Sequence, residues 1–134
     1  MLENYLKKLD DFILAADEIV DIEIIRRSIW DTELEKIAIY RYKIHLYDGS
    51  LVELTERLVE GKGELRRSKY RFHWQTRDGL LIKRWDNAKH HPEISTFPHH
   101  LHDGEEENVV PHKEPDGLEI LSLVIGELSH ISHH

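Results

Sequence analysis

Histidines are concentrated in one short stretch of this sequence, between positions 90 and 102. Five of the eleven histidines of the chain fall there, in the segments Lys89-His-His-Pro92 and Phe97-Pro-His-His-Leu-His102. Folding alone gives a solvated loop no reason to collect imidazoles, because they add little apolar burial and carry no full charge at neutral pH. The concentration therefore indicates acid–base chemistry or metal binding.

Groups suited to acid–base chemistry lie within this stretch and just before it. Histidine can act as a general base or acid, and arginine can hold a phosphate through two hydrogen bonds and stabilise charge on it. Together these groups suffice to cleave RNA through its own 2′-hydroxyl without a metal ion. The catalytic candidates are His73, Arg84, Asp86, His90 and His91, and the substrate-binding candidates are Lys69, Arg71 and Asn87.

In this scheme Arg71 and Arg84 clamp the phosphate and Asp86 orients an imidazole. The base is one of the three catalytic histidines. A structural interpretation stands beside it, in which Asp86 and Arg71 form an ordinary ion pair across two strands and His73 only fills a polar face.

The same imidazoles could instead bind a divalent metal such as zinc or manganese. His100 and His102 would point the same way on an extended chain, and His99, His100 and His102 are the metal candidates, with His90, His91 or Asp86 to complete a tetrahedral site. Adjacent histidines usually diverge, so at most one of each pair should be a ligand. Because the chain has no cysteine, an open catalytic site is favoured over a closed structural zinc site. Histidines that merely hydrogen-bond the loop to a sheet are the remaining alternative.

The composition predicts one domain over residues 1–134 and a cytoplasmic location. A chain of this length can bury a sizeable core, and the absence of cysteine excludes disulfides and thiol nucleophiles. Its apolar runs are short, and its first residues lack the apolar core of a signal peptide, so no membrane partner is expected.

Charge is segregated along the chain, whose net charge is −8. Residues 57–89 carry 10 basic and 4 acidic side chains, whereas residues 1–56 carry 7 and 13 and residues 90–134 carry 1 and 9. A basic centre can hold phosphates, while a net acidic body weakens indiscriminate binding to nucleic acid. A solvated strand face with scattered Lys and Arg would give the same pattern.

Hydrophobic periodicity and turn residues predict an α+β fold. Apolar residues at three- and four-residue intervals indicate a helix over 1–16, and Asp116 with Glu119 three residues later begins a second helix over 117–131. Between them, Asp48-Gly49 and Asp78-Gly79 are hairpin turns of an antiparallel meander of about five strands over 19–87. Both helices should pack on one face of this sheet, and 88–116 should be a functional, histidine-rich loop.

The Asp78-Gly79 turn also predicts the register of the last two strands. With these two residues at the centre of the turn, His73 lies opposite Arg84 and Arg71 lies opposite Asp86. These four side chains then share one polar face, and Phe72 and Trp85 meet on the other. A slip of one residue would invert this arrangement.

Three blocks of the sequence resemble the TumE family of proposed toxins from prokaryotic toxin–antitoxin pairs. They are Tyr70-Arg-Phe-His-Trp-Gln75, Arg84-Trp-Asp-Asn-Ala-Lys-His-His-Pro92 and Phe97-Pro-His-His-Leu-His102. The resemblance implies a small cytoplasmic toxin encoded beside an antitoxin, often of the Uma2-related TumA type. The family positions that it carries over are His73, Arg84, Asp86, Asn87, His90, His91, His99, His100 and His102, and Lys89 replaces a commoner proline.

The sequence therefore predicts a toxin of a toxin–antitoxin pair that cleaves RNA with a His/Arg/Asp cluster. A metal-dependent hydrolase or nuclease is the first alternative. A toxin that acts only by binding protein is the second, with the loop docking onto an antitoxin or a cellular target through exposed residues such as Phe97. The terminal histidines His130, His133 and His134 are irregularly spaced and receive no role.

Overall fold

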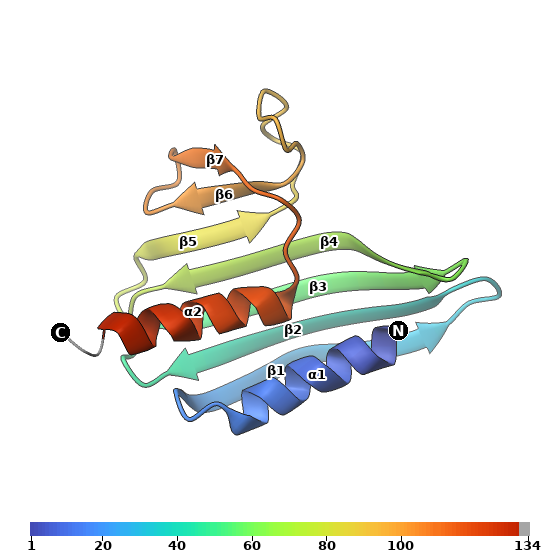
Figure 1. Ribbon diagram of the computed structural model, residues 1–134, viewed down its shortest axis with the longest axis horizontal. Helices are drawn as coiled ribbons and strands as arrows, with labels where there is room; N and C mark the ends of the chain where they lie inside the picture. The colour runs from blue at the N-terminus through green and yellow to red at the C-terminus, as the bar shows by residue number, and fades with distance from the viewer. Residues whose placement is uncertain (132–134) are drawn as a thin grey trace.

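A computed structural model describes residues 1–131 as one antiparallel sheet with a helix at each end of the chain (Figure 1). Its elements are α1 (Leu2–Ala15), β1 (Ile19–Asp31), β2 (Lys36–Leu46), β3 (Leu51–Gly61), β4 (Glu64–Gln75), β5 (Leu81–Asp86), β6 (His100–Asp103), β7 (Val109–Pro111) and α2 (Gly117–Ile131). The strands follow one another in the order β1 to β7. The predicted α+β meander is confirmed, and two short strands extend it beyond the five that were expected.

Both helices lie on the same face of the sheet, as Figure 1 shows. Their buried stripes are Leu2, Leu6, Leu9 and Ile13 on α1 and Ile120, Leu121, Val124, Ile125 and Leu128 on α2. They pack on strand residues that include Tyr70, Phe72, Trp74 and Trp85. Asp116 begins α2 as predicted, since its Oδ1 accepts a hydrogen bond from the backbone N–H of Glu119 at 2.7 Å. The last two histidines, His133 and His134, lie outside the described residues, as does the side chain of His130.

The predicted pairing of β4 with β5 is confirmed, although the turn between them differs. His73 lies opposite Arg84 and Arg71 opposite Asp86. The turn closes between Thr76 and Leu80, so its loop has three residues rather than the two that were predicted. A register shift between Trp74 and Gln75 then leaves one extra residue, Ile82, in β5, which restores the expected register at the site.

The segment 88–116, expected as a loop, contains β6 and β7 and so widens the sheet. These strands have 4 and 3 residues, too few to produce a readable alternation of apolar and polar positions. β6 pairs with β5, which places His102 opposite Arg84 and His100 opposite Asp86. The sheet therefore brings the downstream histidines directly beside the upstream arginine and aspartate.

On the face of the sheet that the helices cover, a buried carboxylate links both helices to the strands. Glu56 of β3 is fully buried and accepts hydrogen bonds from the hydroxyls of Tyr5 and Tyr40 and from Arg67. The Tyr5 hydroxyl in turn accepts a hydrogen bond from the backbone N–H of Gly117, at 2.8 Å. Burial raises the pKa of Glu56, and Arg67 and the two tyrosines oppose that rise. This group, the Glu56 network, joins α1, α2 and three strands.

Candidate functional site

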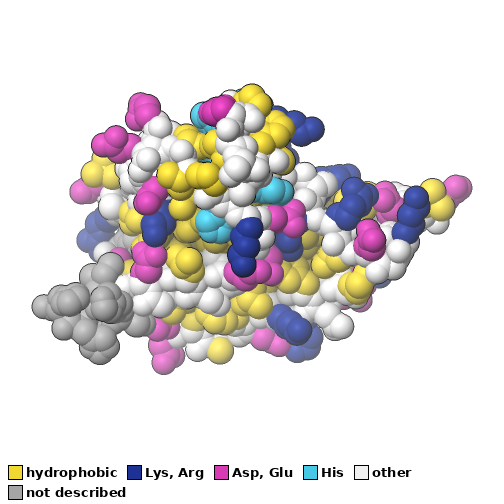
Figure 2. All heavy atoms as spheres, turned by 45° about the horizontal axis from the view of Figure 1, so that its top comes forward, with side chains coloured by type: hydrophobic (Ala, Val, Ile, Leu, Met, Phe, Trp, Pro, Cys, Tyr) yellow, Lys and Arg dark blue, Asp and Glu magenta, His cyan; other side chains and the backbone are white. Residues whose placement is uncertain are grey.

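The candidate site lies on the face of the sheet that the helices leave uncovered, at the end formed by β4, β5 and β6. Side chains directly opposite one another on paired strands share a face. The two cross-strand rows there are His73, Arg84 and His102, and Arg71, Asp86 and His100. Figure 2 shows the side of the molecule that carries the helices, tilted so that the β7 edge comes forward, and a few separate histidine side chains are visible on it.

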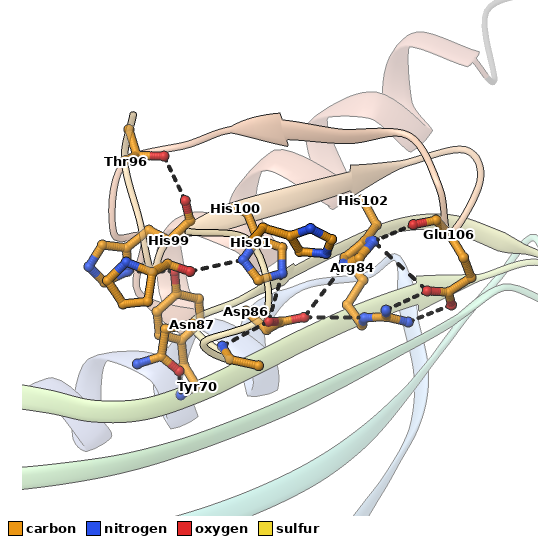
Figure 3. Close-up of polar contacts among 12 residues, drawn as sticks. Tyr70, Arg84, Asp86, Asn87, His91, Thr96, His99, His100, His102 and Glu106 are labelled. Atoms are coloured by element: carbon orange, nitrogen blue, oxygen red, sulfur yellow. Dashed lines mark hydrogen bonds and ion pairs between the residues drawn. The ribbon is translucent and has the colours of Figure 1, made fainter. Parts of the chain in front are cut away.

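Asp86 is the centre of the site (Figure 3). It is 7% exposed, and its Oδ1 lies 3.0 Å from Nε2 of His100 and accepts a hydrogen bond from the backbone N–H of Ala88 at 3.0 Å. Its Oδ2 accepts a hydrogen bond from Nε of Arg84 at 3.3 Å and lies 3.8 Å from Nε2 of His102. The aspartate is therefore held by the strand next to it and by its own strand.

Three histidines come together beside Asp86, and we call them the histidine cluster: His91, His100 and His102. One ring nitrogen from each lies within 4.8 Å of the other two. The ring centroids of His100 and His102 are 4.9 Å apart, and the ring of His91 lies 5.2 Å and 6.0 Å from them. His100 and His102 are buried, whereas His91 is half-buried and reaches them from the segment between β5 and β6 (Figure 3).

Each imidazole of the histidine cluster is oriented by an oxygen acceptor at Nδ1. The Nδ1 of His100 donates to the carbonyl of Pro98 at 2.9 Å, and that of His102 to the carbonyl of Glu106 at 2.8 Å. The Nδ1 of His91 donates to the carboxylate of Glu93 at 3.2 Å. Because these oxygens can only accept, Nδ1 carries the proton, and Nε2 of each neutral ring is left with a free lone pair. Burial also lowers the pKa of His102, which favours its neutral form.

A pocket of about 590 Å³ opens beside this cluster, and Asp86 forms part of its wall. We call it the cationic pocket, because four of its ten lining residues are basic and one is acidic. The lining residues are Ser68, Lys69, Tyr70, Arg71, Arg84, Asp86, Asn87, Ala88, Lys89 and His90.

Three of the four cations in the pocket are available to a ligand. Within residues 1–131, Lys69, Arg71 and Lys89 take part in no ion pair, and all three side chains are exposed. Partial desolvation of its guanidinium and repulsion from the nearby charge of Arg84 lower the pKa of Arg71, whereas Glu53, Asp86 and Glu106 oppose that decrease. An anion in the pocket would relieve that repulsion.

Arg84, expected to clamp a phosphate, is instead occupied by two carboxylates. Its terminal nitrogens donate to both oxygens of Glu106, at 2.7 and 2.5 Å, and its Nε donates to Asp86. The Glu106 hydrogen bonds raise the pKa of Arg84. Arg84 therefore links Asp86 to the turn between β6 and β7, and Arg71 is the guanidinium left for an anion.

The other predicted site residues are divided between the pocket and its support. His90 is exposed and lines the pocket. Asn87 also lines it, but both ends of its amide bind the backbone of β4, at Ser68 and Tyr70. His73 pairs with Gln75 through Nε2, its Nδ1 is buried without a hydrogen-bond partner, and burial and Arg71 lower its pKa.

His99, one of the three metal candidates, lies apart from the histidine cluster. Its ring stacks on that of Tyr70, and its Nδ1 lies 2.9 Å from the Tyr70 hydroxyl. Its neighbour His100 points to Asp86 instead, so the two adjacent histidines diverge. The structure groups His91, rather than His99, with His100 and His102.

Sequence reasoning missed the residues that orient the site from the segment 88–116. Glu106 binds Arg84 through its side chain and His102 through its carbonyl, and Glu93 and Pro98 orient the other two imidazoles. No local spacing singles out these residues, because their roles follow from how the segment between β5 and β6 and the turn between β6 and β7 fold onto the sheet. Only the position of Lys89, beside the paired histidines, could have suggested a further pocket cation.

Comparison with known proteins identifies the family. No curated protein sequence and no solved structure matches the chain significantly. Among the described helices, none has the length and apolar character needed to cross a membrane. The family model described as "Toxin TumE" matches residues 9–131, which include every strand, every candidate site residue, the second half of α1 and all of α2. The chain therefore belongs to the TumE toxin family.

Proposed function

We propose that this toxin acts by cleaving RNA at the cationic pocket. The observation that carries the proposal is the position of Asp86, which forms part of the pocket wall and also contacts the histidine cluster. A phosphate held in the pocket would thus lie beside groups that can transfer protons. Membership of a toxin family supports the toxin role itself.

The pocket has the charge and size for a nucleotide. Lys69, Arg71 and Lys89 offer positive charge that no described carboxylate neutralises by an ion pair, and a volume of about 590 Å³ suits a small-ligand site. The chain as a whole is acidic, which disfavours binding of nucleic acid elsewhere on its surface. We therefore expect the pocket to bind one scissile phosphodiester and its adjoining sugar.

The proposed reaction uses the 2′-hydroxyl of the RNA as nucleophile. His90 takes the proton of this hydroxyl, and its oxygen attacks the adjacent phosphorus. The bond from phosphorus to the 5′-oxygen breaks, and His91 in its doubly protonated form gives that oxygen the proton of its Nε2. The products are a 2′,3′-cyclic phosphate and a 5′-hydroxyl, so atoms and charge balance without an added reagent.

The remaining residues position these groups. Arg71 would bind the phosphate through its guanidinium, and the two lysines would add positive charge. Asp86 and Arg84 would hold the cluster against the pocket, because Arg84 bridges Asp86 and Glu106. Asn87 would keep the end of β5 attached to β4 rather than bind substrate.

The proposed partner in the cell is a cognate antitoxin, which the toxin family implies. We propose one of the Uma2-related TumA type, acting in the cytoplasm, where RNA is accessible. Covering the cationic pocket would be enough for it to block the toxin. A pull-down of the chain by the antitoxin, lost when RNA oligonucleotide is added in excess, would support this mode of inhibition.

The test of the proposed function is cleavage of a labelled RNA by purified protein. We expect cleavage of RNA, a product with a cyclic phosphate end, and no cleavage of the same sequence with 2′-O-methyl groups. Replacement of His90 by Ala should lower the rate by about 10²- to 10⁴-fold, as loss of a general base does. His99→Ala is the matched control and should retain activity.

Growth inhibition must follow the same pattern. Expression without antitoxin should slow growth for the wild type and for His99→Ala, but not for His90→Ala. If folded His90→Ala protein cleaves no RNA and is still fully toxic, the nuclease proposal is wrong and a toxin that binds a protein target takes its place.

A further inference from the structure

We propose that the histidine cluster is a binding site for a divalent transition-metal ion of the zinc class. The ligands are His91, His100 and His102, with Asp86 as the oxygen ligand. Binding of the ion does not depend on the proposed function, but its catalytic role does.

The tautomers of the cluster are the first argument. All three Nδ1 atoms donate to oxygen acceptors, which leaves the lone pair of each Nε2 free when the rings are neutral. Histidines that bind metal through one nitrogen almost always donate the other N–H to a carboxylate or backbone carbonyl. Pro98, Glu106 and Glu93 supply these acceptors from three separate points of the segment between β5 and β7.

Asp86 supplies the second argument. Its Oδ1 lies 3.0 Å from Nε2 of His100, and its Oδ2 lies 3.8 Å from Nε2 of His102. With only Nδ1 of both rings protonated, the Nε2 lone pairs would face a carboxylate at short range, which is repulsive unless a proton or a metal ion lies between them. Arg84 contacts only one edge of the carboxylate, and its own charge is shared with Glu106.

The dimensions of the cluster fit a single small ion. In a tetrahedral zinc site with bonds of about 2.0–2.1 Å, neighbouring ligand atoms are roughly 3.3 Å apart. The imidazole nitrogens lie within 4.8 Å of one another, and the Asp86 oxygen is already at 3.0 Å from its histidine. His91 is half-buried on an irregular segment, so its ring can close the remaining gap while the buried pair stays in place.

The ligand chemistry selects the class of ion. Three imidazoles and one carboxylate, without thiolate or carbonyl ligands, suit zinc and neighbouring ions better than magnesium or calcium, which prefer oxygen. In the proposed cleavage such an ion would neutralise the leaving 5′-oxygen or a phosphoryl oxygen, in place of the proton from His91. The proton for the leaving oxygen then comes from solvent.

Zinc titration of the chelator-stripped protein, followed by calorimetry, tests the site directly. The tetrahedral ligand field can be read independently from the visible absorption of bound Co²⁺. We expect saturation at one ion per chain. His91→Ala, on the surface segment, and His100→Gln, in the sheet, should each weaken zinc binding by more than about 100-fold, beyond the 10- to 100-fold typical of groups that only orient a ligand.

The adjacent histidines provide matched controls. His90→Ala and His99→Ala remove one imidazole at neighbouring positions outside the cluster and should leave zinc affinity unchanged. A variant with His130, His133 and His134 all replaced by Ala should also bind normally. Circular dichroism of each variant checks that loss of binding is not loss of the fold.

The outcomes separate this inference from the proposed function. Absence of zinc binding by the wild type, equal binding by folded His91→Ala, or binding that disappears only with the terminal histidines would each overturn the metal site. RNA cleavage by protein that binds no metal would leave the proposed function standing alone. Stoichiometric zinc in a protein that cleaves no RNA would support the site and refute the nuclease.

Discussion

Two buried carboxylates on opposite faces of the same sheet organise this molecule in different ways. Glu56 and Asp86 are both less than 10% exposed, and each contacts an arginine. Glu56 receives hydrogen bonds from two tyrosine hydroxyls as well, and the helices seal it from solvent. Asp86 faces the Nε2 atoms of two imidazoles, and it borders a pocket.

The difference shows how the same residue type can serve structure or chemistry. A carboxylate whose partners are all donors has nothing left to offer a ligand, and its burial is tolerated because it is fully paired. A carboxylate beside groups with unused lone pairs can accept a cation or take part in proton transfer. We therefore infer that Glu56 holds the fold and Asp86 serves the site.

The largest effect on stability should come from breaking the Glu56 network. Glu56→Ala leaves Arg67, whose side chain is 12% exposed, without its buried partner, and such a loss typically costs about 3–5 kcal/mol. Urea unfolding should show this decrease in the free energy of unfolding. Glu35→Ala, which removes the exposed ion pair with Arg66, is the control and should change stability by only about 0–1 kcal/mol.

If Glu56→Ala fails to fold at all, Glu56→Gln gives the measurable comparison, since it retains the shape and removes only the charge. A Glu56→Ala protein within about 1 kcal/mol of the wild type would contradict the structural role assigned to this carboxylate.

A smaller effect, on binding rather than stability, is expected in the cationic pocket. Arg71→Ala removes a charge-assisted contact to phosphate, worth about 1.5–3 kcal/mol, or roughly 10- to 100-fold in affinity for an RNA oligonucleotide. Because the salt dependence of binding reflects the number of phosphate contacts, its slope should also become shallower. Fluorescence anisotropy at several salt concentrations measures both. Arg66→Ala, on the same strand but outside the pocket, should bind like the wild type; equal binding by Arg71→Ala would remove Arg71 from the site.

The smallest expected effect is a change in the pH dependence of stability at His73. Burial and Arg71 lower the pKa of His73 in the folded protein, so the unfolded chain binds more protons as the pH falls below about 6.5. The contribution of His73 to stability is therefore full above that pH and decreases as the pH falls toward the folded-state pKa. His73→Gln should remove this part of the decrease between pH 7.5 and pH 5.5 in urea unfolding. Parallel pH curves for the two proteins would refute the shift.

Much of this arrangement was readable from the sequence, because it depends on local signals. The Asp78-Gly79 turn and the strand alternation predicted that Arg71, His73, Arg84 and Asp86 share a face, and the pairing confirms it. Although the turn is one residue longer than expected, the extra residue in β5 cancels the error. The helices were predicted by their apolar stripes and by the cap at Asp116.

The unpredicted features depend on contacts between distant segments. A register shift between Arg57 and Leu58 leaves Ser68 without a cross-strand partner. As a result, Arg67 points to Glu56 on the helix face, whereas strict alternation would place it on the opposite face, with Lys69. β6 is too short to be recognised as a strand, so the pairing of His100 with Asp86 had no local signal. Because β6 could not be recognised, the sequence also placed His99 among the metal candidates. The structure instead groups His91, from the segment between β5 and β6, with His100 and His102.

Asp86→Asn tests the central claim most directly, with RNA cleavage and urea unfolding measured on the same preparation beside Glu56→Gln. The amide keeps the shape of the carboxylate and removes the charge that faces the histidine cluster. We predict that Asp86→Asn stays folded while its cleavage rate falls by about 10²-fold, because the contact that positions the histidine cluster is lost, and that folded Glu56→Gln remains active but less stable. A folded Asp86→Asn protein that cleaves RNA at the wild-type rate, or a Glu56→Gln protein of wild-type stability that has lost cleavage, would contradict the division between the two faces.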